Sequence, residues 1–204
     1  MKTAELHSYV EQCLEKPGAR TAFLERLVEM ENEAGSPVKS DHGRIAEIAE
    51  VYIYAVIGQL EASEAAANDQ DTRGWADPMI RIAVQYFVDP DDLIPDALGL
   101  YGLVDDAYLA HKFILRLSAA VEAEKGFPLI ANLTDENMDL IRPIVGDEIA
   151  QKLDDKVDAS INSITVRNQM ARLGMVSGTL PTHDSELWAK VRASREKISW
   201  TPSE

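Results

Sequence analysis

The spacing of its apolar residues constrains this chain most, because they recur every three or four positions through nearly all 204 residues. Such spacing gathers apolar side chains on one face of an α-helix, whereas a half-buried strand needs them at every second position. Apolar residues make up 46% of the chain, which is enough for a sizeable core at this length. The sequence therefore predicts an all-α fold, a compact multi-helix domain of about seven to eight helices.

Glycine and proline clusters divide the helical pattern and set the predicted boundaries. We expect one helical domain over 1–173, a linker over 174–183, and a C-terminal helix and tail over 184–204. The last helix carries Leu187, Trp188, Val191 and Ile198 on one side. It packs either on its own core or on another protein or second copy. The predicted helices are 3–16, 20–34, 42–68, 75–88, 103–124, a short helix after Thr134 interrupted at Pro143 and Gly146, 147–173 and 184–198.

The charge of the chain restricts its partners. The formal net charge is −15 and the sequence pI is about 4.6. Phosphates of nucleic acids attract Lys and Arg, so we expect no nucleic-acid binding. Docking on an anionic membrane is disfavoured for the same reason. Basic proteins and divalent cations are the more natural counterparts.

Three features indicate a cytoplasmic protein. Cys13 is the single cysteine, so no intrachain disulfide can form, which suits a reducing compartment. The N-terminal sequence lacks the apolar core of a signal peptide. The longest uncharged apolar helical stretch, 51–60, is too short to span a bilayer, so no membrane span is expected.

Residues 89–106, DPDDLIPDALGLYGLVDD, contain six aspartates and no basic residue. One interpretation is structural: Asp89 caps a first turn, Asp96 caps a second, and Asp105 and Asp106 open the helix expected from about 103, each cap contributing about 1 kcal/mol. If that helix begins before Val104, capping cannot explain the last two aspartates.

A second interpretation brings the carboxylates together. Proline and glycine let two short turns fold back, which would place Asp92 and Asp96 near Asp105 and Asp106. Clustered carboxylates repel one another unless a proton, a cation or an arginine balances them. Magnesium, manganese and calcium prefer oxygen ligands, so these four residues are candidate metal ligands. The third interpretation is an arginine clamp, from Arg81, from Arg116 or from a partner.

The spaced motif resembles the YkvA-like bacterial family, a domain of unknown function. Asp92-Leu93-Ile94-Pro95-Asp96 is followed after eight residues by Asp105-Asp106, and Gly102 precedes the pair by three residues, as in that family. The resemblance covers roughly 75–120 and implies a small helical module in which Asp92, Pro95, Asp96, Gly102, Asp105 and Asp106 matter. It implies no reaction. Gly99 stands where the family often has a second proline, which predicts a looser turn here.

Other candidate sites are weaker. His111 lies on an otherwise apolar face and is interpreted as a core histidine with satisfied hydrogen bonds. Asp154-Asp155 would pair with Asp105-Asp106 in a diphosphate-binding enzyme, but Lys152 and Lys156 beside them favour an exposed face of mixed charge.

Three functions remain open. The first is a non-enzymatic role in protein interaction or regulation, with a protein partner or self-association through 184–200. The second is a cation-dependent hydrolase or transferase that acts on a phosphorylated small molecule and uses Asp92, Asp96, Asp105 and Asp106 as ligands. The third and weakest is an acidic mimic of nucleic acid.

Overall fold

A computed structural model describes residues 3–34, 41–69, 72–88, 93–131, 133–134 and 136–172. Within these ranges all regular structure is helical, which confirms the all-α prediction. The predicted linker 174–183 and the C-terminal helix with Leu187, Trp188, Val191 and Ile198 lie outside the described residues. The elements of the described part are η1 (Thr3–Glu5), α1 (Leu6–Leu14), α2 (Thr21–Ala34), α3 (His42–Asp69), α4 (Arg73–Tyr86), η2 (Asp96–Leu98), α5 (Leu100–Lys125), α6 (Glu136–Val145) and α7 (Asp147–Arg172).

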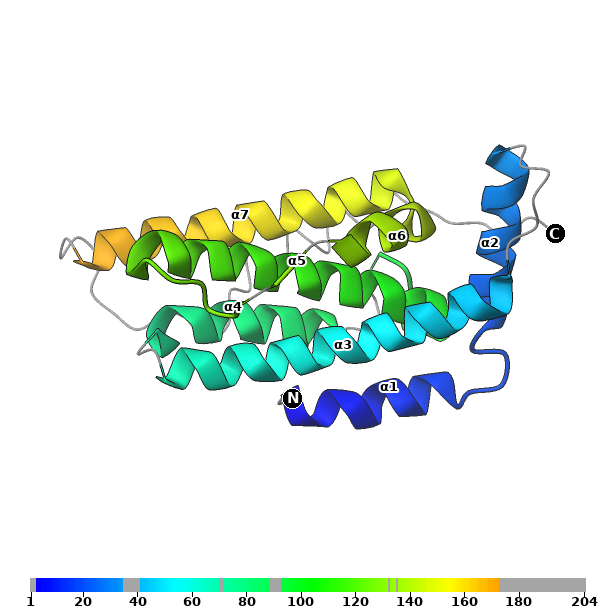
Figure 1. The fold of residues 1–204 in the computed structure, drawn as a ribbon, viewed down its shortest axis with the longest axis horizontal. Helices are drawn as coiled ribbons and strands as arrows, with labels where there is room; N and C mark the ends of the chain where they lie inside the picture. Colours follow the sequence, from blue (N-terminus) through cyan, green and yellow to red (C-terminus); the bar gives the residue numbers. More distant parts are fainter. Residues whose placement is uncertain are drawn as a thin grey trace.

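The long helices α3, α5 and α7 run roughly along the longest axis of the molecule, with α4 beside them (Figure 1). Helix α1 lies along α3, and α2 stands steeply at the end where α3 begins. Helix α5 packs against α3, α4, α6 and α7 and also contacts α1, α2 and η2. The fold is therefore a bundle built around α5.

The sequence of α5 explains its central place. Every residue from Gly102 to His111 is buried, so this part of the helix is enclosed on all sides. A helix enclosed in this way must be apolar or satisfy its polar groups inside the protein. Asp105, Asp106 and His111 are the polar members of the enclosed stretch, and their surroundings decide what the motif does.

Helix α5 begins at Leu100, earlier than the predicted 103, because the chain turns sharply at Gly99. Gly99 has φ +63°, and a Cβ there would lie 2.3 Å from the carbonyl oxygen of Ala19. The Leu100 N–H donates a 2.7 Å hydrogen bond to that same oxygen. The turn is thus held against the loop between α1 and α2, and the prediction of a looser turn is wrong.

One further expectation needs correction. Pro143 was expected to interrupt the helix after Thr134, yet α6 continues through Pro143 and ends at Val145, before Gly146. Ile48 of α3 is apolar, yet 44% of its surface is exposed. None of the helices in the described ranges combines the length and the apolar character that crossing a membrane requires.

Candidate functional site

The aspartates of the motif that the structure describes are buried. Asp96 is the first residue of η2 and is 3% exposed, and Asp105 and Asp106 are fully enclosed in the second turn of α5. A side chain in the second turn cannot cap the helix, because the unsatisfied N–H groups belong to the first turn. Capping is therefore wrong for Asp105 and Asp106.

Gly102 allows η2 to lie directly on α5. A Cβ at Gly102 would meet the Pro95 carbonyl oxygen at 2.7 Å and the Asp96 Cα at 2.9 Å. Asp105 and Asp106 follow Gly102 by three and four residues, so they project from the same side of the helix. The spacing of the motif therefore allows the η2 turn to pack against one face of α5.

Tyr9 of α1 joins this cluster through its hydroxyl group, which donates a hydrogen bond to the Asp96 carboxylate. Burial raises the pKa of Tyr9 most, followed by the bond to Asp96 and its charge, and the charge of Asp106 adds to the rise. Burial likewise raises the pKa of the Cys13 thiol, and Asp96 contributes. Three elements, α1, η2 and α5, therefore meet at the motif.

Two of the proposed counter-ions are elsewhere. Arg116 pairs with Asp158, at 2.8 Å from its Nε to the Oδ1 atom, and Arg81 is exposed. Asp92, a fourth predicted ligand, lies outside the described residues. Among the residues that are described, no three His, Cys, Asp or Glu side chains are grouped as a metal ion would require. The cation site stays a prediction.

A half-open pocket of about 330 Å³ lies next to the motif, between α2, the start of α5 and the junction of α6 and α7. Leu98 and Tyr101, from the motif segment, form part of its wall. Burial raises the pKa of the Tyr101 hydroxyl, while nearby Arg26 opposes the rise and Asp105 adds to it. Tyr101 therefore lines the pocket and also lies within reach of the Asp105 charge.

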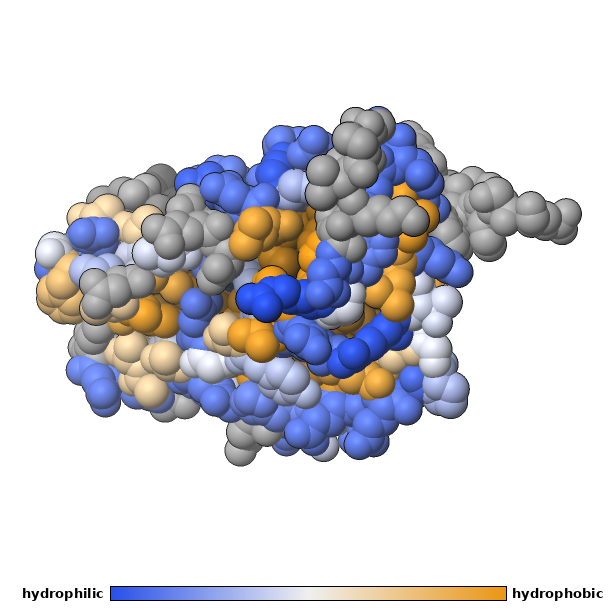
Figure 2. All heavy atoms as spheres, turned by 45° about the vertical axis from the view of Figure 1, so that its right-hand side comes forward, coloured by the Kyte–Doolittle hydropathy of each residue, from blue (hydrophilic) through white to orange (hydrophobic). Residues whose placement is uncertain are grey.

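The pocket combines apolar and acidic groups. Its carboxylates are Glu25 and Glu29 from α2 and Asp147 and Glu148 from the start of α7, and its basic residue is Arg26. Arg26 forms a 3.4 Å ion pair with Glu29. The lining thus carries a formal charge of −3, from four acids and one base. Apolar surface comes from Ala22, Leu98, Val145 and Ile149, together with the Tyr101 ring. The same end of the molecule comes forward in Figure 2, where hydrophobic and hydrophilic side chains lie next to one another.

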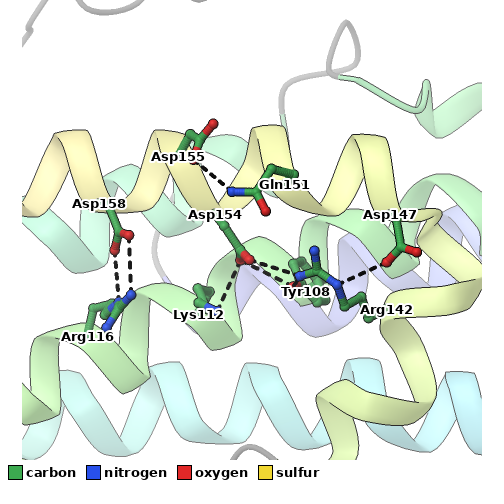
Figure 3. A network of polar contacts seen from close by, with 9 residues as sticks. All are labelled: Tyr108, Lys112, Arg116, Arg142, Asp147, Gln151, Asp154, Asp155 and Asp158. Atoms are coloured by element: carbon green, nitrogen blue, oxygen red, sulfur yellow. Dashed lines mark hydrogen bonds and ion pairs between the residues drawn. The ribbon is translucent and has the colours of Figure 1, made fainter.

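A second polar cluster ties α5 to α6 and α7 (Figure 3). Asp154, whose side chain is 14% exposed, lies 3.2 Å from Lys112 Nζ and 2.9 Å from Arg142 Nη1. Tyr108 donates a hydrogen bond to Asp154, and burial together with Asp154 raises its pKa to about 12. Of the pair expected on an exposed face, Asp155 is exposed as predicted, whereas Asp154 is mostly enclosed and the prediction is wrong for it.

Sequence reasoning missed this cluster, although a signal for it was present. Lys112 and Arg116 are four residues apart on α5, and Asp154 and Asp158 are four residues apart on α7. Residues at i and i+4 lie on one helix face, so a basic pair and an acidic pair at the same spacing can face each other. No comparable sequence pattern indicates that Arg142 of α6 joins the cluster.

The prediction for His111 is confirmed. The ring is buried, with Nδ1 3.2 Å from the Tyr52 hydroxyl and Nε2 3.1 Å from the carbonyl oxygen of Thr134. A carbonyl can only accept, so Nε2 carries the proton and Nδ1 accepts from Tyr52. His111 therefore joins α3, α5 and the segment before α6.

Comparison with known proteins supports the motif and little else. A family model described as a protein of unknown function (DUF1232) matches residues 79–111. The match includes all residues of the aspartate motif and is shorter than the 75–120 predicted from the resemblance. Neither the curated proteins nor the solved structures give a match to this chain. Residues 79–111 are thus similar to a family whose function is not known.

Proposed function

We propose that this protein is a non-enzymatic interaction protein that binds a basic segment of a partner protein in the pocket beside the aspartate motif. The observation that carries the proposal is the position of the motif. Its η2 turn packs closely on α5 at Gly102, and the same segment supplies Leu98 and Tyr101 to the pocket wall. We also infer that the matched segment is a YkvA-like module, on the spacing of its aspartates.

A lysine or arginine side chain fits the lining on two counts. Its aliphatic stem can lie against the apolar residues and the Tyr101 ring, while its charged end meets the carboxylates at the rim. The charge of −3 around the pocket and of −15 on the whole chain attracts such a segment from a distance. We place this interaction in the cytoplasm, where no disulfide is needed for stability.

The test measures binding of labelled hexalysine and hexa-arginine peptides to the full chain, by fluorescence anisotropy at physiological ionic strength. The variant Glu25→Gln/Glu29→Gln is expected to weaken binding at least about tenfold, since charged interface pairs contribute on the order of 1 kcal/mol or more each. The control Glu11→Gln/Glu122→Gln removes the same charge from exposed positions on α1 and α5.

Two results would contradict the proposal. If both double variants weaken binding equally, the peptides respond only to overall charge. If neither peptide binds the wild-type chain, the pocket does not accept a basic segment.

A cation-dependent hydrolase or transferase is the second candidate. The observation in its favour is the approach of Asp96 and Asp106 to the same tyrosine, because neighbouring buried carboxylates are stabilised by a positive partner. Magnesium, manganese or calcium would suit such oxygen ligands.

Thermal melting tests this second candidate. Wild type, Asp105→Asn and Asp106→Asn are melted in EDTA and then with each cation in millimolar amounts. A cation at a hundred times its Kd adds about 2.7 kcal/mol to the unfolding free energy. A rise in Tm of several degrees in wild type alone is expected for a bound cation, and equal melting in EDTA and in all three salts rejects it.

A further inference from the structure

We propose that the outer face of α3 is the contact surface of a homodimer in which the α3 helices of two copies pack antiparallel. The surface consists of eight positions on one side of the helix, separated alternately by four and three residues. Six are apolar and the two outermost are charged. They are Arg44, Ile48, Val51, Ala55, Gly58, Ala62, Ala65 and Asp69, and we call them the α3 seam.

All eight residues are exposed. Ile48 and Val51 are two of the large apolar side chains that the described part exposes, at 44% and 68%. An exposed helix face is normally polar, and apolar residues alternating at three and four positions are the pattern by which two helices pack together. The seam runs from Arg44 to Asp69, 26 residues, which at a rise of 1.5 Å per residue is about 37 Å.

The order of side-chain sizes along the seam favours an antiparallel second copy. The large residues Ile48 and Val51 lie near the start of the helix, and the small residues Ala62 and Ala65 lie near its end. In an antiparallel pair, Ile48 faces Ala65 of the second copy and Val51 faces Ala62. Ala55 faces Gly58 in the middle, where small side chains permit close approach. Each layer then combines a larger residue with a smaller one, as interdigitating packing requires.

The charged ends of the seam fit the same arrangement. Arg44 on one copy faces Asp69 on the other, and the twofold axis repeats this pair at both ends. A parallel pair would instead place Arg44 against Arg44 and Asp69 against Asp69. In the row beside the seam Glu47 faces Asn68, while Tyr54 and Glu61 of that row contact His7 of α1. The antiparallel register therefore avoids like charges along its length.

The charges at the two ends are also unfavourable for α3 by itself. Arg44 lies in the first turn, where the helix dipole favours acids, and Asp69 is the last residue, where it favours bases. Neither side chain forms an ion pair within the described residues. In the antiparallel dimer Arg44 and Asp69 pair with each other across the interface. This pairing explains why both charges occur at helix ends where they are unfavourable in the monomer.

The interface is narrow, and each chain carries a charge of −15, so a weak dimer with a micromolar Kd is expected. Sedimentation equilibrium on the full chain at physiological ionic strength, from micromolar to near-millimolar protein, measures it. Ala55→Glu places two carboxylates in the middle of the seam and should raise Kd at least about tenfold. The unfolding transition should not change, because Ala55 is exposed in the monomer.

Charge reversal tests the register. Arg44→Asp alone brings two acids together at each end, as Asp69→Arg alone brings two bases together, and each should weaken the dimer several-fold. The double variant Arg44→Asp/Asp69→Arg restores both pairs and should recover the wild-type Kd to within about threefold. In a parallel dimer each position faces its own counterpart, so wild type and all three variants carry like charges at both ends. Single variants that leave Kd unchanged, or a double variant that stays as weak as the single ones, would therefore overturn the antiparallel register.

Two further results would overturn the α3 seam as an interface. One is a wild-type chain that stays monomeric throughout the concentration range. The other is a dimer that is insensitive to Ala55→Glu but is lost when residues 179–204 are deleted, which would place self-association in the C-terminal segment.

Discussion

Gly102 is a position in the motif where the packing leaves no room for a side chain. Gly102→Ala would add a methyl group less than 3 Å from the backbone of Pro95 and Asp96, which cannot move as a flexible side chain can. We expect the unfolding free energy to fall by about 1–3 kcal/mol, the usual cost of overpacking. Urea unfolding monitored by circular dichroism measures the change.

Gly58→Ala is the matched control for this substitution. Gly58 is also a helical glycine, but a Cβ there has open space around it. Measured at low protein concentration, this variant should gain up to about 1 kcal/mol from helix propensity. Equal effects of the two substitutions would show that the contact between η2 and α5 is not tight.

Asp154 and Asp158 offer a second comparison between similar residues in different surroundings. Asp154 is mostly enclosed and balances Lys112 and Arg142, whereas the Asp158 side chain is 45% exposed and pairs with Arg116 alone. Asp154→Asn should lower the unfolding free energy by about 1–3 kcal/mol, and Asp158→Asn by less than about 1 kcal/mol. Thermal melting of both variants at one ionic strength measures the two losses of stability. A larger loss for Asp158→Asn would contradict the conclusion that Asp154 stabilises the fold more.

At the scale of elements, Tyr9 is what connects α1 to the motif. Tyr9→Phe keeps the ring and removes the hydrogen bond to Asp96, so we expect a loss of about 1–3 kcal/mol. Tyr54→Phe, on a half-buried ring stacked on His7, is the control and should cost less. Denaturant unfolding of the two variants gives the comparison.

The pH dependence of this effect has a defined sign. The pKa of Tyr9 is higher in the folded chain than its usual value of 10.0, so folding favours the neutral hydroxyl. Its contribution is complete below about pH 10 and is lost as pH rises through the folded pKa. The difference between wild type and Tyr9→Phe should therefore shrink above pH 10. A difference that grows there would contradict the assignment.

The elements themselves were largely predictable, and their ends less so. Apolar spacing located the helices from α1 to α7, because each of them buries at least one face. The start of α5 was placed too late, since Gly99 and Gly102 were interpreted as local turns. Gly99 is instead set by the backbone of Ala19, about 80 residues away. A contact of this kind leaves no periodic signal in the sequence.

The candidate site, too, could be predicted from the sequence only in part. The motif could be recognised from its spacing, and the matched family model agrees. The burial of Asp96, Asp105 and Asp106 could not be predicted, because it depends on elements on every side of α5. The pocket likewise joins α2, α5 and α7, which are distant in the sequence.

At the scale of the whole molecule, the charge of −15 makes stability depend on salt. Fifteen uncompensated negative charges on one chain repel one another, and added salt screens that repulsion over distances beyond about 10 Å at 0.1 M. The melting temperature should therefore rise as NaCl increases from low to physiological concentration. MgCl2 at equal ionic strength is the control, since an additional rise there indicates cation binding. A fall in Tm with NaCl would mean that ion pairs such as those around Asp154 outweigh the net charge.

The hydrogen bond from the Leu100 N–H to the Ala19 carbonyl oxygen also determines which segment of this protein could be moved to another scaffold. The segment 79–111 is what sequence similarity marks out, and it would be the natural piece to excise or graft onto another scaffold. Yet Tyr9 and Ala19, which hold its aspartate and its tight turn, lie outside it. The recognisable module is therefore smaller than the autonomous folding unit. A graft has to bring the N-terminal helices with it, and the excised segment alone should behave as an unstructured peptide.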